Sequence, residues 1–264
     1  MAELAFHVTM KMFDEQVLAA TAALRRRLSR CIWERADSPG VLAFRLADTH
    51  VHVLFCGSRA AACRLAHAVE CSLRHHLSLP PRFDAARIRP IRGRDHLARS
   101  FDYVMLQDVR HETFVDPLHE GGSMLDLLGL RVTGRSTRST VRRALPAVDR
   151  AHLVGLMLRG LDVTPAAFDP TPTLGGDGLE SLRESVLSAA CLPSLSGRSA
   201  PVFEAHVAAL HAALPWTSPS AAAARLGVPR STAHAWVRRE PDPALVAAIQ
   251  AQLHLRAHLP AVGF

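Results

Sequence analysis

An alternating apolar stretch at residues 41–55 places the strongest constraint on how this chain can fold. Successive residues of a strand point to opposite faces of a sheet, so His50 and His52 are expected side by side on one face. Val51 and Val53 would point to the other face. Whether the histidines face the helices or the open face of the sheet is left open by this pattern. Two neutral imidazoles on a rigid strand form half of a divalent-metal site. With 15 His in 264 residues, roughly one His-x-His pair is also expected by chance. Other residues of the chain must therefore show whether this pair belongs to a metal site.

The segments around this stretch predict further strands and helices in a regular order. Strands are expected at residues 5–10, 41–46, 50–55 and 83–91, and helices at 15–30, 59–77 and 95–111. The first six elements follow the split βαβ order, with the first and third strands as the central pair. We therefore predict an α+β fold, in which a ferredoxin-like βαββαβ antiparallel sheet carries an appended helix.

The remainder of the chain reads as helical. Segments 119–130, 141–161, 179–192 and 200–214 have helical spacing, and a Pro- and Gly-rich linker is expected at 166–177. We predict three regions: the sheet domain at 1–115, a helical middle region at 116–214 and a DNA-binding region at 215–264.

Residues 218–240 carry the pattern of a helix-turn-helix. A first helix is expected from Pro219 to Leu226, Gly227 supplies the tight turn, and a second helix follows with Ala233 and Trp236 facing inward. An ordinary pair of packed helices is the alternative. The side chains expected to face a DNA groove are those of Arg230, Ser231, Thr232, His234 and Arg238.

The charge of the chain points to nucleic acid as a partner. The net charge is +7, and Lys11 is the only lysine among the 31 basic residues. Arginine matches the geometry of phosphate, which favours nucleic acid. An Arg- and Ala-rich composition inherited from a GC-rich genome is an equally weighted alternative. Five cysteines without a Cys-x-x-Cys pair, and the lack of a membrane span or leader sequence, predict a cytoplasmic protein.

Tyr103 and Gln107 supply a second set of candidate reactive groups. They are four residues apart on an expected helix and so share a face, and Tyr103 is the only tyrosine of the chain. Tyrosine is a weak nucleophile at its ordinary pKa of about 10, but a metal that polarises a phosphodiester reduces this handicap. A half-buried core aromatic at position 103 and a solvated amide at position 107 are the alternatives.

These motifs, in this order and spacing, resemble the single-tyrosine HUH transposases, and among them the REP-associated tyrosine transposases. The resemblance covers residues 3–115 and rests on Phe6-His7-Val8-Thr9, His50-Val51-His52 and Tyr103-Val104-Met105-Leu106-Gln107. It implies that His50, His52 and Gln107 bind a divalent cation, Mg²⁺ or Mn²⁺. It also implies that Tyr103 attacks single-stranded or hairpin DNA, leaving a 5′-phosphotyrosine and a free 3′-OH. The chain departs from the family in having Asp48-Thr49 where an Asn often precedes the first histidine.

Three functions are therefore weighed. The first is a DNA transposase or strand-transfer enzyme that works through Tyr103 and a divalent metal, either within one chain or across a homodimer. The second is a catalytically inactive DNA-binding regulator that acts on duplex DNA through its helix-turn-helix. The third is a metal hydrolase that uses His50 and His52 with His7, although no carboxylate base is evident for it.

Overall fold

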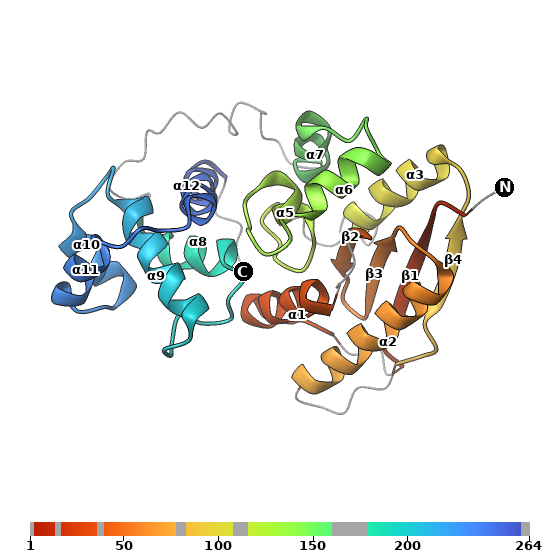
Figure 1. Ribbon diagram of the computed structural model, residues 1–264, viewed down its shortest axis with the longest axis horizontal. Coiled ribbons are helices and arrows are strands. Elements are labelled where there is room, and N and C mark those ends of the chain that lie inside the picture. Colours follow the sequence, from red (N-terminus) through yellow and green to blue (C-terminus); the bar gives the residue numbers. More distant parts are fainter. Residues whose placement is uncertain are drawn as a thin grey trace. The chain divides into compact units, whose positions relative to one another are not determined.

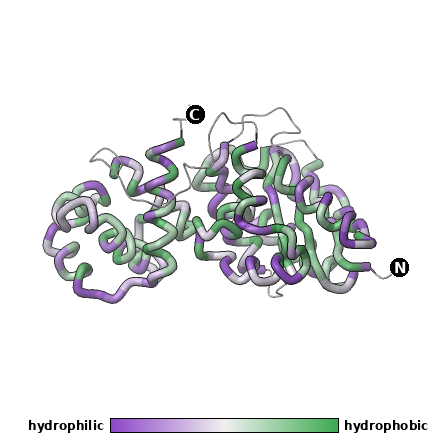
Figure 2. Tube along the Cα trace, turned by 90° about the horizontal axis from the view of Figure 1, so that it is seen from above, coloured by the Kyte–Doolittle hydropathy of each residue, from purple (hydrophilic) through white to green (hydrophobic). Residues whose placement is uncertain are grey.

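The computed structural model describes residues 3–13, 17–35, 40–77, 83–107, 116–159 and 179–259. The chain forms two compact units, the first comprising residues 1–128 and 134–161 and the second residues 129–133 and 162–264. Hydrophobic segments occur in both units, as the green parts of the trace in Figure 2 show. Each unit accordingly buries a hydrophobic core of its own.

The first unit begins with a four-stranded antiparallel sheet, so the predicted α+β class is confirmed. Its strand order is β2-β3-β1-β4, and the first and third strands are the inner pair (Figure 1). The elements of this unit are β1 (Ala5–Lys11), α1 (Ala22–Arg35), β2 (Val41–Leu46), β3 (His50–Phe55), α2 (Arg59–His76), β4 (Arg87–Ile91), α3 (Arg94–Met105), α5 (Met124–Leu128), α6 (Thr137–Ala144) and α7 (Arg150–Met157).

The two faces of the sheet differ in their covering. Val51 and Val53 of β3 belong to a core that also contains Ile32 of α1 and Leu65 of α2. Helix α3 instead contacts β2 and β3 and lies on the side of the strands away from α1 and α2 (Figure 1). The alternation in residues 41–55 thus separates the valines from the histidines as predicted. The valines face the core with α1 and α2, and His50 and His52 face the side of α3.

The hairpin and the helix after it lie where the sequence predicted them. Strands β2 and β3 have the expected bounds, and the backbone N–H of Ala47 donates to His50 O at 2.9 Å across the short connection. Ser58 caps α2, since its hydroxyl accepts from Ala61 N at 3.2 Å. The outer edge of strand β2 makes a hydrogen bond to a later segment, because Leu46 N donates to Gly121 O at 2.6 Å.

The prediction for the first helix is wrong at its start and at its end. Helix α1 begins at Ala22 and runs to Arg35, whereas the sequence suggested 15–30. Thr21 sets the start, since its hydroxyl accepts from Leu24 N at 3.2 Å. Leu18 is held before the helix by a bond from its backbone N–H to Asp48 O of 2.7 Å. Tertiary contact has therefore overridden the helical spacing of residues 17–20.

Other predicted elements are shorter than expected. Strand β4 begins at Arg87, and Phe83 makes only an isolated bridge to Met12. Helix α3 ends at Met105, and the expected continuation through residues 108–111 lies outside the described residues. In the middle region α5 covers only Met124–Leu128, and the spacing of 141–161 is divided between α6 and α7. The expected linker at 166–177 lies outside the described residues.

The secondary structure described in the second unit consists of helices. Its helices are α8 (Leu182–Ala189), α9 (Ala200–Ala213), α10 (Pro219–Leu226), α11 (Arg230–Trp236) and α12 (Pro243–His258). Helix α12 packs on α8 and α9. Its buried Gln252 also donates a hydrogen bond to Leu130 O at 2.7 Å. Across both units, the described helices include none with the length and apolar character needed to cross a membrane.

Candidate functional site

The face of the sheet below α3 gathers polar side chains from neighbouring strands. In the strand register His52 lies opposite Thr9 of β1 and Arg45 of β2, and His50 lies opposite Lys11. Residues directly opposite each other in antiparallel strands project to the same face. A row of imidazole, hydroxyl and guanidinium groups thus crosses the sheet at its centre.

Three imidazoles meet in this row. The ring centroids of His50 and His52 are 4.5 Å apart, and those of His7 and His52 are 5.0 Å apart. His7 Nε2 and His52 Nδ1 share a hydrogen bond of 2.9 Å, and Thr9 Oγ1 is 3.4 Å from the same His52 nitrogen. His52 is only 3% exposed, so its ring is fixed by its neighbours. His7, which the metal-hydrolase hypothesis grouped with the pair, is thus a neighbour of His52.

Tyr103 joins the histidine cluster from α3. Its ring centroid is 5.5 Å from that of His52 and 5.6 Å from that of His7, with the rings close to edge-on in both pairs. The predicted nucleophile and a predicted metal ligand, 51 residues apart in sequence, are therefore neighbours in space.

Gln107 lies just beyond the end of α3 and is 1% exposed. Its side-chain amide donates to the backbone oxygen of Tyr103 at 2.7 Å. This bond ties Gln107 to the turn that carries the tyrosine and engages the amide nitrogen. The amide oxygen is consequently the atom through which Gln107 would bind a cation.

The electrostatic environment keeps His7 neutral. Burial lowers its pKa from 6.5 to about 4, and the positive charges of Arg89, His50 and His96 act in the same direction. Arg45 is buried on the same face, and burial lowers its pKa to about 10, so it remains a cation at neutral pH. The face thus combines a neutral imidazole with a buried cation, on which the charges of Asp116 and Asp48 also act.

One ring nitrogen of each of His50 and His52 lies next to a neighbouring side chain. The hydrogen bond to His7 engages His52 Nδ1, and Thr49 Oγ1 lies 3.3 Å from His50 Nδ1. Metal-binding histidines commonly use one ring nitrogen for such a contact and the other for the metal. Within the described part of the chain, no group of three or more His, Cys, Asp or Glu side chains is arranged to hold a metal. A metal at this face would therefore need further ligands of another kind besides His50 and His52.

The sequence reading missed two cations at this site. Arg89 lies opposite His7 and Arg87 lies opposite Thr9, so both project to the histidine face, and both are exposed. Their spacing of two residues is the same signal that revealed His50 and His52. Two further basic residues, His96 and Arg99 of α3, are also exposed.

The predicted DNA-contacting residues lie on a separate surface, in the second unit. Helix α10 has the expected bounds, and the expected second helix, α11, begins at Arg230. Gly227 between them is left-handed with φ of 69°. Ala233 is buried and Trp236 packs on the core of the unit. The five candidate residues lie on or just after α11. Four of them are exposed and Thr232 is partly buried; they are Arg230, Ser231, Thr232, His234 and Arg238.

Comparison with known protein-family models, with curated proteins and with solved structures gives no significant match to this chain.

Proposed function

We propose that this chain is a DNA transposase or strand-transfer enzyme, cleaving and rejoining single-stranded or hairpin DNA through a 5′-phosphotyrosine at Tyr103. The observation that carries the proposal is the convergence of the only tyrosine with the histidine cluster, at 5.5 Å from His52 between ring centroids. A tyrosine that only filled a hydrophobic core would not need to contact histidines. The resemblance to single-tyrosine HUH transposases names the same residues for the same role.

The arrangement of the first unit supports this proposal. The strand order β2-β3-β1-β4, with α1 and α2 covering one face, is compatible with a ferredoxin-like βαββαβ sheet. The histidines then lie on an inner strand and the tyrosine on the appended helix. Rigid strands and helices hold reactive groups more accurately than loops do, which suits a strand-transfer reaction.

The chemistry proposed for Tyr103 is an exchange of phosphate esters. Its Oη forms a bond to phosphorus while the bond from phosphorus to the 3′ oxygen breaks. The phenolic proton is balanced by the proton that the leaving 3′-OH takes up, and attack by a 3′-OH later reverses the step. Mg²⁺ or Mn²⁺ on His50, His52 and Gln107 would polarise the scissile phosphate and stabilise charge on the leaving oxygen.

The other residues of the face would hold the reactants. Neutral His7 orients the ring of His52 through their shared hydrogen bond. Arg87 and Arg89 are exposed beside the cluster and can bind the DNA backbone electrostatically. Their role is to position the strand, while Tyr103 makes the new bond.

A covalent-adduct assay tests the proposal. Purified chain is incubated with a library of single-stranded DNA hairpins, with Mg²⁺ or Mn²⁺ or with chelator, and adducts are separated under denaturing conditions. We expect a metal-dependent adduct and a released strand with a 3′-OH. Tyr103→Phe should abolish both, and because the chain has one tyrosine the modified residue is identified without ambiguity.

Two further variants complete the assay. His52→Ala should lower adduct formation by about 100-fold or more, the size expected for the loss of a metal ligand's contribution. His67→Ala is the matched control, since His67 is an exposed histidine of α2. An adduct that survives Tyr103→Phe would refute the assignment. Free hydrolysis products without an adduct would favour the metal hydrolase.

A second candidate function has its own observation. The exposed residues on and after α11 suit a DNA-binding regulator that acts on duplex DNA as a helix-turn-helix. Deleting residues 216–264 would be a poor test, because it removes α12 from its packing on α8 and α9. Arg230→Ala with Arg238→Ala should instead abolish duplex binding, with Arg143→Ala in α6 as control. Duplex binding lost in this way, together with no adduct under any condition, would favour the regulator.

A further inference from the structure

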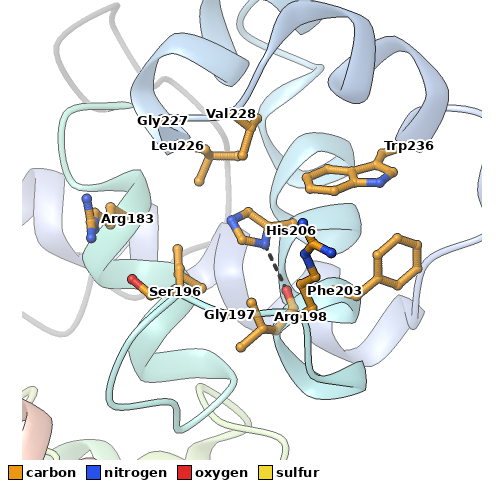
Figure 3. A pocket seen from close by; sticks show the side chains of 12 residues that line it. Arg183, Ser196, Gly197, Arg198, Phe203, His206, Leu226, Gly227, Val228 and Trp236 are labelled. Atoms are coloured by element: carbon orange, nitrogen blue, oxygen red, sulfur yellow. Dashed lines mark hydrogen bonds between the residues drawn. The ribbon is translucent and has the colours of Figure 1, made fainter.

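A pocket of about 470 Å³ opens in the second unit beside the turn that joins α10 and α11. Its walls come from α8, α9, the segment 195–198, the turn and the end of α11. This volume is within the range of small-molecule sites, about 300–1,000 Å³. Figure 3 shows His206 near the centre of the pocket, with Phe203 and Trp236 on one side and Arg183 on the other.

Aromatic rings form one wall of this pocket. Trp236 is in edge contact with Phe203, with ring centroids 5.7 Å apart, and is tilted against His206 at 5.1 Å. Leu226 and Val228 add apolar surface from the α10–α11 turn. A wall of this kind favours a flat, largely apolar ligand, because rings pack against rings over a large area.

The charged residues of the pocket are all cations. Arg183 of α8 and Arg198 of the segment 195–198 line the pocket, and both are exposed. Among the described residues that line it, none is an aspartate or a glutamate. Arginine recognises carboxylate oxygens through its planar fork of donors, so the pocket favours an anion.

His206 adds a directed hydrogen-bond acceptor. It is 7% exposed, and its Nδ1 donates to Val202 O at 2.9 Å, since a carbonyl can only accept. Burial lowers the pKa of His206. The charge of Arg183 also lowers this pKa, whereas the hydrogen bond to Val202 raises it. In the neutral ring Nε2 then carries the lone pair, which can accept from a hydroxyl or N–H group of a ligand.

We propose that this pocket binds a small aromatic or heterocyclic carboxylate that carries a hydroxyl or N–H donor. Arg183 and Arg198 lie on opposite sides of His206 (Figure 3), and one of them binds the carboxylate. Trp236 and Phe203 contact the ring, and His206 Nε2 accepts from the donor. This binding site goes beyond strand transfer and does not depend on it. Because Trp236 ends α11 and Val228 lies in the turn before it, the ligand would contact both ends of α11.

The three tryptophans of the chain provide the assay. Full-length chain labelled with ¹⁵N-tryptophan gives indole signals from Trp33, Trp216 and Trp236, with Trp236→Phe assigning the last. Titration with 6-hydroxy-2-naphthoate should shift the Trp236 signal and leave that of Trp33 in place. The dissociation constant should be on the order of 0.1 mM, as expected for a ligand of this size.

Matched ligands and variants identify the contacts. The neutral 6-hydroxy-2-naphthamide should bind about tenfold more weakly, as should the acid to Arg183→Ala or Arg198→Ala. Arg239→Ala, an exposed arginine that does not line the pocket, is the control. The proposal is overturned if neither 6-hydroxy-2-naphthoate nor 4-hydroxybenzoate shifts Trp236 at roughly 5 mM. Equal binding of acid and amide, or no effect of either arginine variant in folded protein, overturns it too.

Discussion

The histidine–tyrosine cluster of the sheet and the α10–α11 pair are held together in different ways. The cluster joins His7, His52 and Tyr103, which come from the first strand, the third strand and a later helix. The α10–α11 pair is complete within residues 219–236. The first depends on strand register and helix docking over about a hundred residues, whereas the second depends on local caps and one turn.

This difference decides what each region tolerates. A register shift of one residue moves every side chain of a strand to the other face, so it would separate His52 from Tyr103. The α10–α11 pair is set by Ser218, whose hydroxyl accepts from Ala221 N at 3.2 Å, and by the left-handed Gly227. Long-range anchors should therefore dominate the stability of the first unit, and single backbone positions that of the helix pair.

The largest stability effect is expected at a buried ion pair of the first unit. Arg26 Nη1 donates to both carboxylate oxygens of Glu120, at 2.8 and 3.0 Å, and both side chains are buried. Glu120→Gln leaves the Arg26 charge without its full partner, which should cost about 3 kcal/mol or more of unfolding free energy. Hydrogen exchange measured peptide by peptide should show the loss in the first unit.

A matched variant sharpens this result. Glu34 pairs with Arg30 at 3.8 Å on α1 but is 60% exposed, so Glu34→Gln should cost less than about 0.5 kcal/mol. Equal losses for the two variants would contradict the view that residues 94 apart in sequence hold this unit together.

A medium effect is expected at two glycines and should have opposite signs. A Cβ added at Gly227 or at Gly155 meets nothing within 4 Å. The effect of an alanine on stability therefore depends only on the backbone conformation at each position. Gly227 has φ of 69°, and Gly227→Ala should cost about 1 kcal/mol. Gly155 lies inside α7, and Gly155→Ala should stabilise by about 0.5 kcal/mol or more. Thermal unfolding of both variants measures the signs, and two losses of similar size would refute the local account.

The sequence predicted local features better than long-range ones. Pro219, Gly227 and Pro229 mark the ends of α10 and α11, and each acts through its own backbone. The alternation at residues 41–55 predicted β2 and β3 because a hairpin also forms between neighbours. Spacing alone placed the start of α1 too early, since the bond from Leu18 N to Asp48 O cannot be read from the segment itself.

The candidate site shows the same limit. His50 and His52 share a face by strand geometry, and that part follows from the sequence. The contact of His7 with His52, and the opposition of Arg89 to His7, depend on the register of β1 with its two neighbours. The proximity of Tyr103 required the resemblance to a known family, because no local rule places a helix over one face of a sheet.

The smallest effect is a pH dependence of the second unit, through His206. Its folded-state pKa lies below the ordinary value of 6.5 because of burial and the charge of Arg183, although the hydrogen bond to Val202 O raises it. Between that lowered pKa and 6.5 the unfolded chain binds more protons than the folded one, so stability rises with pH. The contribution is therefore fully present above pH 6.5 and is lost as the pH falls through the folded-state pKa. Urea unfolding of wild type and His206→Gln across this interval should give curves that diverge toward neutral pH in favour of wild type. Parallel curves would mean that His206 titrates alike in both states, and that its buried ring does not stay neutral as the pocket requires.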